Sequence, residues 1–66
     1  MDYSGTSRYV RVRINAEAEG HWKEYVGQEC DAIIYEDGIS PHVNSEQLNP
    51  PLPKYQSIKA SWVDIL

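Results

Sequence analysis

The sequence predicts a small, mainly β domain, and three observations carry that prediction. Residues 8–14 alternate between polar and apolar side chains, the period-two pattern of a half-buried strand. Residues 28–35 end in an apolar run that is followed by an Asp-Gly pair, the strongest short signal for a β-hairpin. The chain has 66 residues, which is enough for one domain at most.

The first predicted strand covers residues 8–14. One face holds Val10, Val12 and Ile14, and the other holds Tyr9, Arg11 and Arg13. Residues 1–7 before it are polar and show no period, so we expect a flexible leader followed by a single domain over residues 8–66.

Residues 15–27 are the most ambiguous part of the chain. Residues 16–19 favour helix by propensity, but Gly20 interrupts them after one turn. A long, partly ordered loop that carries Trp22 and Tyr25 is therefore the favoured interpretation, with a tight turn at Val26-Gly27 leading into the next strand.

The second predicted strand covers residues 28–35 and pairs with a third over residues 39–44. The turn between them is expected to be type I′ at Asp37-Gly38, since that turn needs positive φ at both central positions. Pro41 cannot donate a ladder hydrogen bond, so we expect it at a sheet edge or with its nitrogen facing outward.

The last third of the chain is expected to combine short elements. Residues 45–48 predict one helical or 3₁₀ turn, capped by Ser45, with Leu48 filling the core. Residues 49–53 contain three prolines and must be extended. Residues 55–66 fit either a helix or a strand; the content of residues 62–65 favours strand, with Trp62 in the core.

Composition excludes several function classes. The formal net charge of −4 argues against charge-driven binding along a nucleic-acid backbone. Cys30, His21 and His42 lack the paired spacing of a structural metal site, so we expect no metal and no cofactor. The carboxylates show no catalytic spacing and no phosphate-binding or nucleophile motif is present, so we do not expect an enzyme and assign no catalytic residue.

The compartment expected from the sequence is the cytoplasm. A single cysteine permits no internal disulfide, which fits a reducing environment. The N-terminal residues lack an apolar signal-peptide core, and no apolar run reaches the roughly 20 residues that span a bilayer.

The predicted layout resembles the small SH3-like β-barrels, in a partly open form with a single 3₁₀ or helical turn. That layout is a strand, a long aromatic loop (residues 15–27), two strands joined by a tight turn, one helical turn (residues 45–48) and a closing strand (residues 62–65). The acidic loop and the Ala-Leu-Tyr-Asp-Tyr run of signalling SH3 domains are absent, so their peptide-binding role is not carried over. Size and acidity also resemble small accessory proteins of bacteriophages.

The first candidate site is the aromatic loop. Trp22 and Tyr25, with His21 and Lys23 beside them, have the composition of a binding hot spot for a larger protein partner. The alternative is that Trp22 folds back to cap a core that contains no Phe. The favoured function is therefore a non-catalytic protein-binding accessory module.

Other interpretations stay open. Tyr9, Arg11 and Arg13 combine a stacking ring with cations, as single-stranded nucleic acid requires, although a solvated strand face is the commoner use of this pattern. A small homo-oligomeric structural component would suit so small a core. The Pro-Pro-Leu-Pro string of residues 50–53 matches a WW-ligand pattern, but a stiff connector is the favoured interpretation.

Overall fold

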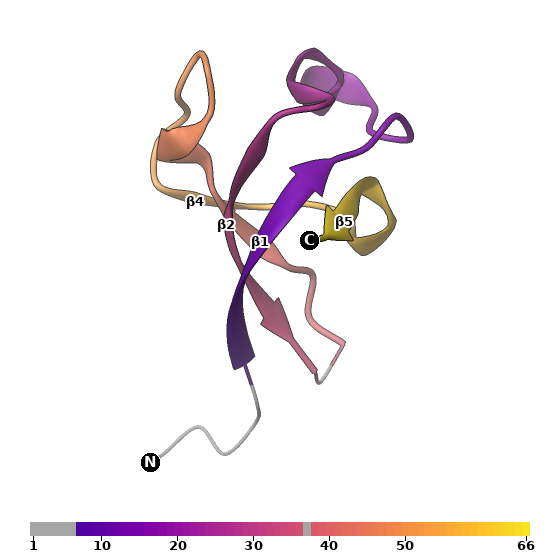
Figure 1. Cartoon of the computed structure of the whole chain (residues 1–66), viewed down its shortest axis with the longest axis vertical. Helices are drawn as coiled ribbons and strands as arrows, with labels where there is room; N and C mark the ends of the chain where they lie inside the picture. The colour runs from indigo at the N-terminus through magenta and orange to yellow at the C-terminus, as the bar shows by residue number, and fades with distance from the viewer. Residues whose placement is uncertain (1–6, 37) are drawn as a thin grey trace.

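The computed structural model describes residues 7–36 and 38–66, and these form a mainly β molecule as predicted. Five antiparallel strands make one sheet in the order β4-β3-β2-β1-β5 (Figure 1). The strands are β1 (Ser7–Ile14), β2 (Glu29–Tyr35), β3 (His42–Asn44), β4 (Tyr55–Ser57) and β5 (Val63–Ile65). Three 3₁₀ segments connect them: η1 (Gly20–Tyr25), η2 (Ser45–Gln47) and η3 (Ala60–Trp62).

The long ladder between β1 and β2 is the frame of the sheet. It pairs the whole length from Ser7↔Tyr35 to Arg13↔Glu29, whereas β5 pairs with β1 only between Val12 and Ile14. The predicted alternation of β1 is confirmed. Val12 and Ile14 are fully buried, while Tyr9 is 77% exposed. Ser7 already belongs to β1, and the rest of the predicted leader lies outside the described residues.

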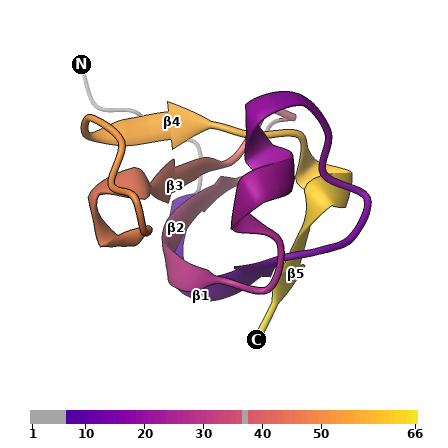
Figure 2. The same cartoon turned by 90° about the horizontal axis from the view of Figure 1, so that it is seen from above.

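The segment expected to be a partly ordered loop contains η1 instead. Gly20 begins this helix with φ of 63°, the left-handed region that residues with a side chain rarely adopt. Trp22 and Tyr25, three residues apart on a 3₁₀ helix, then fall on the same face and both turn into the core. Packing of these two rings therefore gives the segment its order. Seen from above, η1 lies across one end of the curved sheet (Figure 2).

The hairpin between β2 and β3 has the predicted register, but β3 is shorter than expected. The pairs Ala32↔Val43 and Ile33↔His42 are centred on residues 37 and 38, where the turn was predicted. Asp37 lies outside the described residues; Gly38 has the positive φ, 92°, that such a turn needs. Strand β3 begins at His42 and not at residue 39, and Pro41, directly before it, bonds through its carbonyl to Ile58 on the β4 side.

Pro41 does not lie at a free sheet edge, so that alternative of the prediction is wrong. The strand that follows it, β3, lies between β2 and β4. The Pro41 carbonyl accepts a hydrogen bond from the Ile58 N–H at 2.9 Å. The absence of an N–H on Pro41 is therefore tolerated, because Pro41 lies directly before the first residue of a strand.

The predicted turn over residues 45–48 is η2, and Leu48 is buried as expected. Ser45 does not cap it. Its buried hydroxyl instead donates to the Lys54 carbonyl, while its own carbonyl accepts the Leu52 N–H at 3.0 Å. These bonds clamp the proline-rich segment against η2. Residues 50–53 connect η2 to β4, and their stiffness stays a prediction.

The last twelve residues, left open between strand and helix, contain two short strands separated by η3. The favoured strand is confirmed as β5. Trp62 was expected in the core; it is only partly buried and packs against the core from outside, with the Lys59 ammonium 5.9 Å from its ring. Three 3₁₀ segments are present among the described residues where one was expected.

The core lies on one face of the sheet beneath η1. Its buried members are Val12, Ile14, Ala18, Trp22, Tyr25, Cys30, Ala32, Val43, Leu48 and Ile58. None of the helical segments in the described ranges has the length and apolar character needed to cross a bilayer.

Candidate functional site

The aromatic pair of η1 is a structural plug and not an exposed contact surface. Trp22 is 4% exposed and Tyr25 is 3% exposed, and their rings meet edge to face at 5.8 Å. The Tyr25 hydroxyl donates to the Pro50 carbonyl at 2.7 Å. The expectation that these two rings are displayed to a partner is therefore corrected: a core without Phe uses them to close one end.

The two neighbours assigned to the same site do reach solvent. His21 and Lys23 are exposed on η1, and the imidazole of His21 lies 4.8 Å from the Trp22 ring. Without Trp22 and Tyr25, they form no apolar centre for an interface. A desolvated centre is what carries most binding energy.

The outer face of β1 carries the residues considered for nucleic acid. Arg11 and Arg13 project there, but each meets a carboxylate on the directly paired residue of β2. Arg11 Nη1 lies 3.2 Å from Asp31 Oδ1, and Arg13 Nη2 lies 2.9 Å from Glu29 Oε2. The positive charge of this face is thus locally balanced, which weakens attraction to phosphates.

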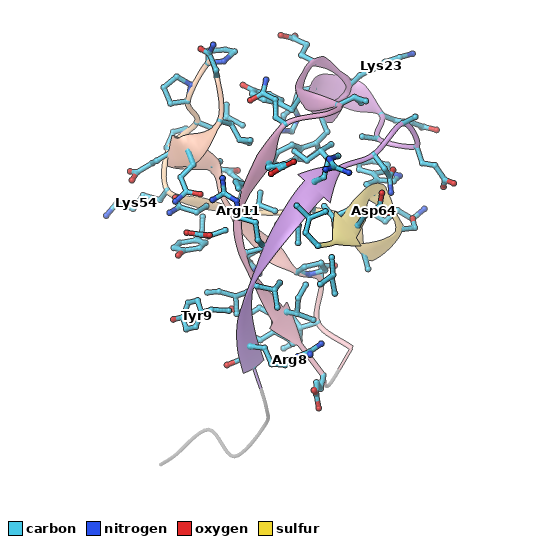
Figure 3. All side chains as sticks on the ribbon, viewed as in Figure 1. Arg8, Tyr9, Arg11, Lys23, Lys54 and Asp64 are labelled. Carbon is cyan, nitrogen blue, oxygen red and sulfur yellow. The ribbon has the colours of Figure 1, made fainter. Side chains whose placement is uncertain are left out.

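Tyr9 projects from β1 into solvent (Figure 3). It borders a shallow hollow of about 330 Å³ together with Val10, Arg11, Asp31 and Tyr55. Tyr55, on β4, is 42% exposed. The sequence prediction missed Tyr55, because its place beside Tyr9 depends on the pairing of β3 with β4.

The charged floor of this hollow is internally satisfied. The Gln47 amide donates to Asp31 Oδ2 at 3.0 Å and the Arg11 guanidinium lies on the other oxygen, and these bonds hold the pKa of the Asp31 carboxyl below its ordinary value of 3.8. Gln47 Oε1 also accepts the Asp31 N–H at 2.7 Å. Asp31 is therefore an ionised structural anchor and has no free oxygen directed at a ligand.

The thiol and imidazole groups form no reactive set. Burial raises the pKa of the Cys30 thiol, which favours the protonated, unreactive form. His42 packs edge to face on the Tyr35 ring at 5.5 Å, and its buried Nδ1 has no hydrogen-bond partner. Among residues 7–36 and 38–66, no three His, Cys, Asp or Glu side chains are placed to hold a metal ion.

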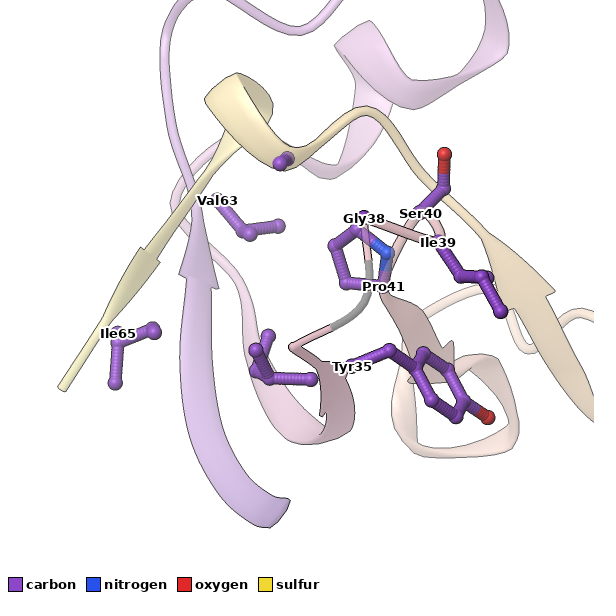
Figure 4. Close-up of a pocket in the computed structure, with 9 residues that line it drawn as sticks. Tyr35, Gly38, Ile39, Ser40, Pro41, Val63 and Ile65 are labelled. Atoms are coloured by element: carbon purple, nitrogen blue, oxygen red, sulfur yellow. The ribbon is translucent and has the colours of Figure 1, made fainter. Parts of the chain in front are cut away.

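A second, more apolar hollow lies at the other end of the sheet from η1. We call it the open-end groove; it has a volume of about 270 Å³ and lies between the β2–β3 hairpin and β5 (Figure 4). It is lined by Ile34, Tyr35, Gly38, Ile39, Ser40, Pro41, Ala60, Val63 and Ile65. Among the described residues, the walls are mostly aliphatic and include no charged side chain.

Two aliphatic side chains at the mouth of the groove are half exposed. Ile39 is 49% exposed and Ile65 is 52% exposed. Neither tryptophan covers these side chains, because Trp22 lies in the core and Trp62 packs at its edge. An apolar hollow of this kind can bind an aliphatic or aromatic side chain of another molecule.

Sequence reasoning missed the open-end groove. Its residues come from segments 34–41 and 60–65, which are distant in the chain and meet only because β5 returns to pair with β1. The apolar residues next to the Asp-Gly pair were interpreted only as strand. The one available signal was that Ile39 follows this turn, where an exposed polar residue is commoner.

Comparison of the chain with protein-family models, with curated proteins and with solved structures found no match.

Proposed function

We propose that this chain is a non-catalytic protein-binding module that contacts its partner through the open-end groove. The observation that carries the proposal is an apolar hollow whose described lining residues carry no charge and which two half-exposed isoleucines border. Exposed aliphatic side chains gathered around a hollow are typical of contact sites between proteins. The partner is expected to insert one apolar side chain between Ile39 and Ile65.

The proposed surface differs from the one that the sequence suggested. Trp22 and Tyr25 are buried, so contact through them would first require η1 to leave the core. The groove needs no such rearrangement, since its walls are already formed by the hairpin and β5. Binding to a preformed surface avoids the ordering cost that weakens association.

A photocrosslinking experiment tests this assignment. A benzophenone amino acid replaces Ile39 in one variant and Glu17, which is exposed in the segment before η1, in a matched control. We expect irradiation of cells that produce the protein to give a defined crosslinked protein from position 39 alone. Equal yields from both positions, or no product from position 39, would contradict the proposal.

A second candidate is binding of single-stranded nucleic acid in the hollow between Tyr9 and Tyr55. The exposed rings on two strands provide stacking surfaces, and Arg11 supplies a cation in the same hollow. The carboxylates paired with Arg11 and Arg13 make this candidate the weaker one.

Fluorescence anisotropy with a short, labelled, mixed-sequence oligonucleotide distinguishes the two. Nucleic-acid binding requires affinity that falls steeply as salt rises and that is lost in the double variant Tyr9→Ala, Tyr55→Ala. No binding at low salt would remove this candidate and leave the groove proposal unaffected.

A further inference from the structure

The side of β1 that faces away from β2 is paired along only part of its length. Near its C-terminal end, β1 is paired on both sides, with β2 on one and β5 on the other. The β5 ladder stops at Val12↔Ile65, and one more bond, from the Leu66 N–H to the Arg11 carbonyl at 2.9 Å, follows it. Among the described residues, no strand pairs with that side of β1 between Ser7 and Val10.

The hydrogen-bond pattern shows which backbone groups point to this side. Ile14 exchanges bonds with the residues before β2, donating to Gln28 at 3.0 Å and accepting from Gly27 at 2.7 Å. Asn15 and Arg11 instead bond to the β5 side, through Trp62 and Leu66. Since bonding direction alternates along a strand, the N–H and C=O of Ser7 and Tyr9 point to the unpaired side.

We propose that this edge binds an extended segment of the partner protein, which adds to the sheet as a strand in line with β5. This inference rests on the proposed function, because it defines how the partner reaches the open-end groove. The added strand runs antiparallel to β1 and exchanges backbone hydrogen bonds with Tyr9 and Ser7. It continues the β1–β5 ladder, with the same spacing, beyond Leu66.

Register determines what the added side chains meet. Ile65, opposite Val12, lines the groove, so the added residue opposite Val10 lies on the same face, one pleat further along and next to Ile65. An apolar side chain there would extend the groove wall and be covered by its mouth. The next residue on this face lies opposite Arg8.

Charge at Arg8 selects the chemistry of the partner. Arg8 is exposed, and its ion pair with Glu36 is loose, with 3.7 Å between Nε and Oε2. A carboxylate directly across a strand pair from an arginine is stabilising, whereas a like charge there is destabilising. The segment that fits therefore alternates, with an apolar residue opposite Val10 and Asp or Glu opposite Arg8.

The same charge argues against a second copy of this chain as the occupant. Among the self-paired registers that leave the Leu66 bond to Arg11 intact, the one that pairs most of the described edge places Ser7 opposite Tyr9 of the second copy. That register puts Arg8 directly opposite Arg8 of the second copy. A shift of the register by two residues brings Ser7 of the second copy to the position opposite Arg11, which Leu66 already occupies.

Selection from a displayed library of random octapeptides tests the proposal even while the partner protein is unidentified. We expect selected peptides to share an apolar residue two positions before Asp or Glu. Tyr9→Pro removes the N–H on the unpaired side and leaves the β2 ladder intact, so we expect it to lower their affinity about tenfold or more. Tyr9→Ala, which keeps the N–H, should bind as the unchanged chain does.

The outcomes separate this inference from the groove proposal. A synthetic chain with N-methyl-Tyr9 serves if Tyr9→Pro does not fold. Peptides that bind Tyr9→Pro and the N-methyl-Tyr9 chain as tightly as the unchanged chain, but lose affinity for Ile39→Lys, would overturn strand addition and keep the groove. Failure to select any peptide would also overturn strand addition. A dimer by light scattering that Tyr9→Pro dissociates would identify a second copy and overturn the partner assignment.

Discussion

The two ends of this sheet contrast in how they treat apolar side chains. At the end covered by η1, Trp22 and Tyr25 are almost completely buried. At the other end, Ile39 and Ile65 border a hollow and keep about half of their surface in solvent. One end therefore buries its large side chains in the core, and the other leaves apolar surface in contact with solvent.

The contrast shows where a small domain can place a binding surface. A chain of this length has few large side chains with which to build a core. Here the tryptophan and tyrosine of the long connection serve the core, so the proposed contact surface is made from aliphatic residues of the β2–β3 hairpin and of β5. Aromatic residues in a long loop are thus poor guides to function when the core lacks Phe.

The largest expected effect is at the covered end. Trp22→Ala empties the centre of the η1 contact, and we expect a loss of about 3–5 kcal/mol in the free energy of unfolding. Urea denaturation followed by circular dichroism measures it. A loss below about 0.5 kcal/mol, the range of ordinary surface changes, would show that η1 is not part of the core.

The next effect isolates one hydrogen bond at the same end. Tyr25→Phe keeps the ring against Trp22 but removes the hydroxyl that donates to the Pro50 carbonyl. We expect a loss of about 1 kcal/mol, and more if the carbonyl then lies unpaired and away from water. The same urea titration checks it, and an unchanged midpoint would mean that water replaces the hydroxyl fully.

At the open end, replacing an apolar side chain with a polar one should lower the free energy of unfolding only slightly. Ile39→Ser alters a half-exposed side chain, so we expect the free energy of unfolding to change by about 0.5 kcal/mol or less. The same variant should lower the affinity of the selected peptides. A loss of stability comparable to that of Trp22→Ala would erase the contrast between the two ends.

The smallest expected effect concerns pH. The pKa of Asp31 is lowered by Gln47 and Arg11, so its ionised form stabilises the fold above the ordinary value of 3.8. This contribution is lost as pH falls through the lower pKa of the folded state. Gln47→Ala should move that pKa back toward 3.8 and make acid unfolding begin at a higher pH.

Thermal unfolding of Gln47→Ala and the unchanged chain, from about pH 6 to about pH 2, measures this effect. An identical pH dependence for the two proteins would show that Gln47 does not perturb Asp31. Neither result would alter the assignment of the groove.

Local patterns predicted the strands better than the connections. Alternation in residues 8–14 and the Asp-Gly pair depend on near neighbours, and β1 and the hairpin register agree with them. Burial of Trp22 and partial exposure of Trp62 depend on contacts between distant segments, which no local pattern contains. Strand β3 starts at His42, three residues later than predicted, directly after Pro41, a residue type that is confined to the first position of a strand or to sheet edges.

The candidate site could not be predicted for the same reason. The predicted face of Tyr9, Arg11 and Arg13 exists, but the carboxylates that balance it come from β2, twenty residues away in the case of Arg11 and Asp31. The open-end groove requires the return of β5 to β1. The sequence contains the residues of such a site, but only the fold brings them together.

An amide-resolved NMR titration tests most directly whether the open end is the contact surface. The nitrogen-15-labelled chain is titrated with the protein that position 39 crosslinks. We expect the largest shift changes in residues 34–41 and 63–66 and in residues 7–10 of β1, with residues 20–25 unchanged. Changes centred on residues 20–25, or on Tyr9, Arg11 and Tyr55 alone, would contradict the proposal.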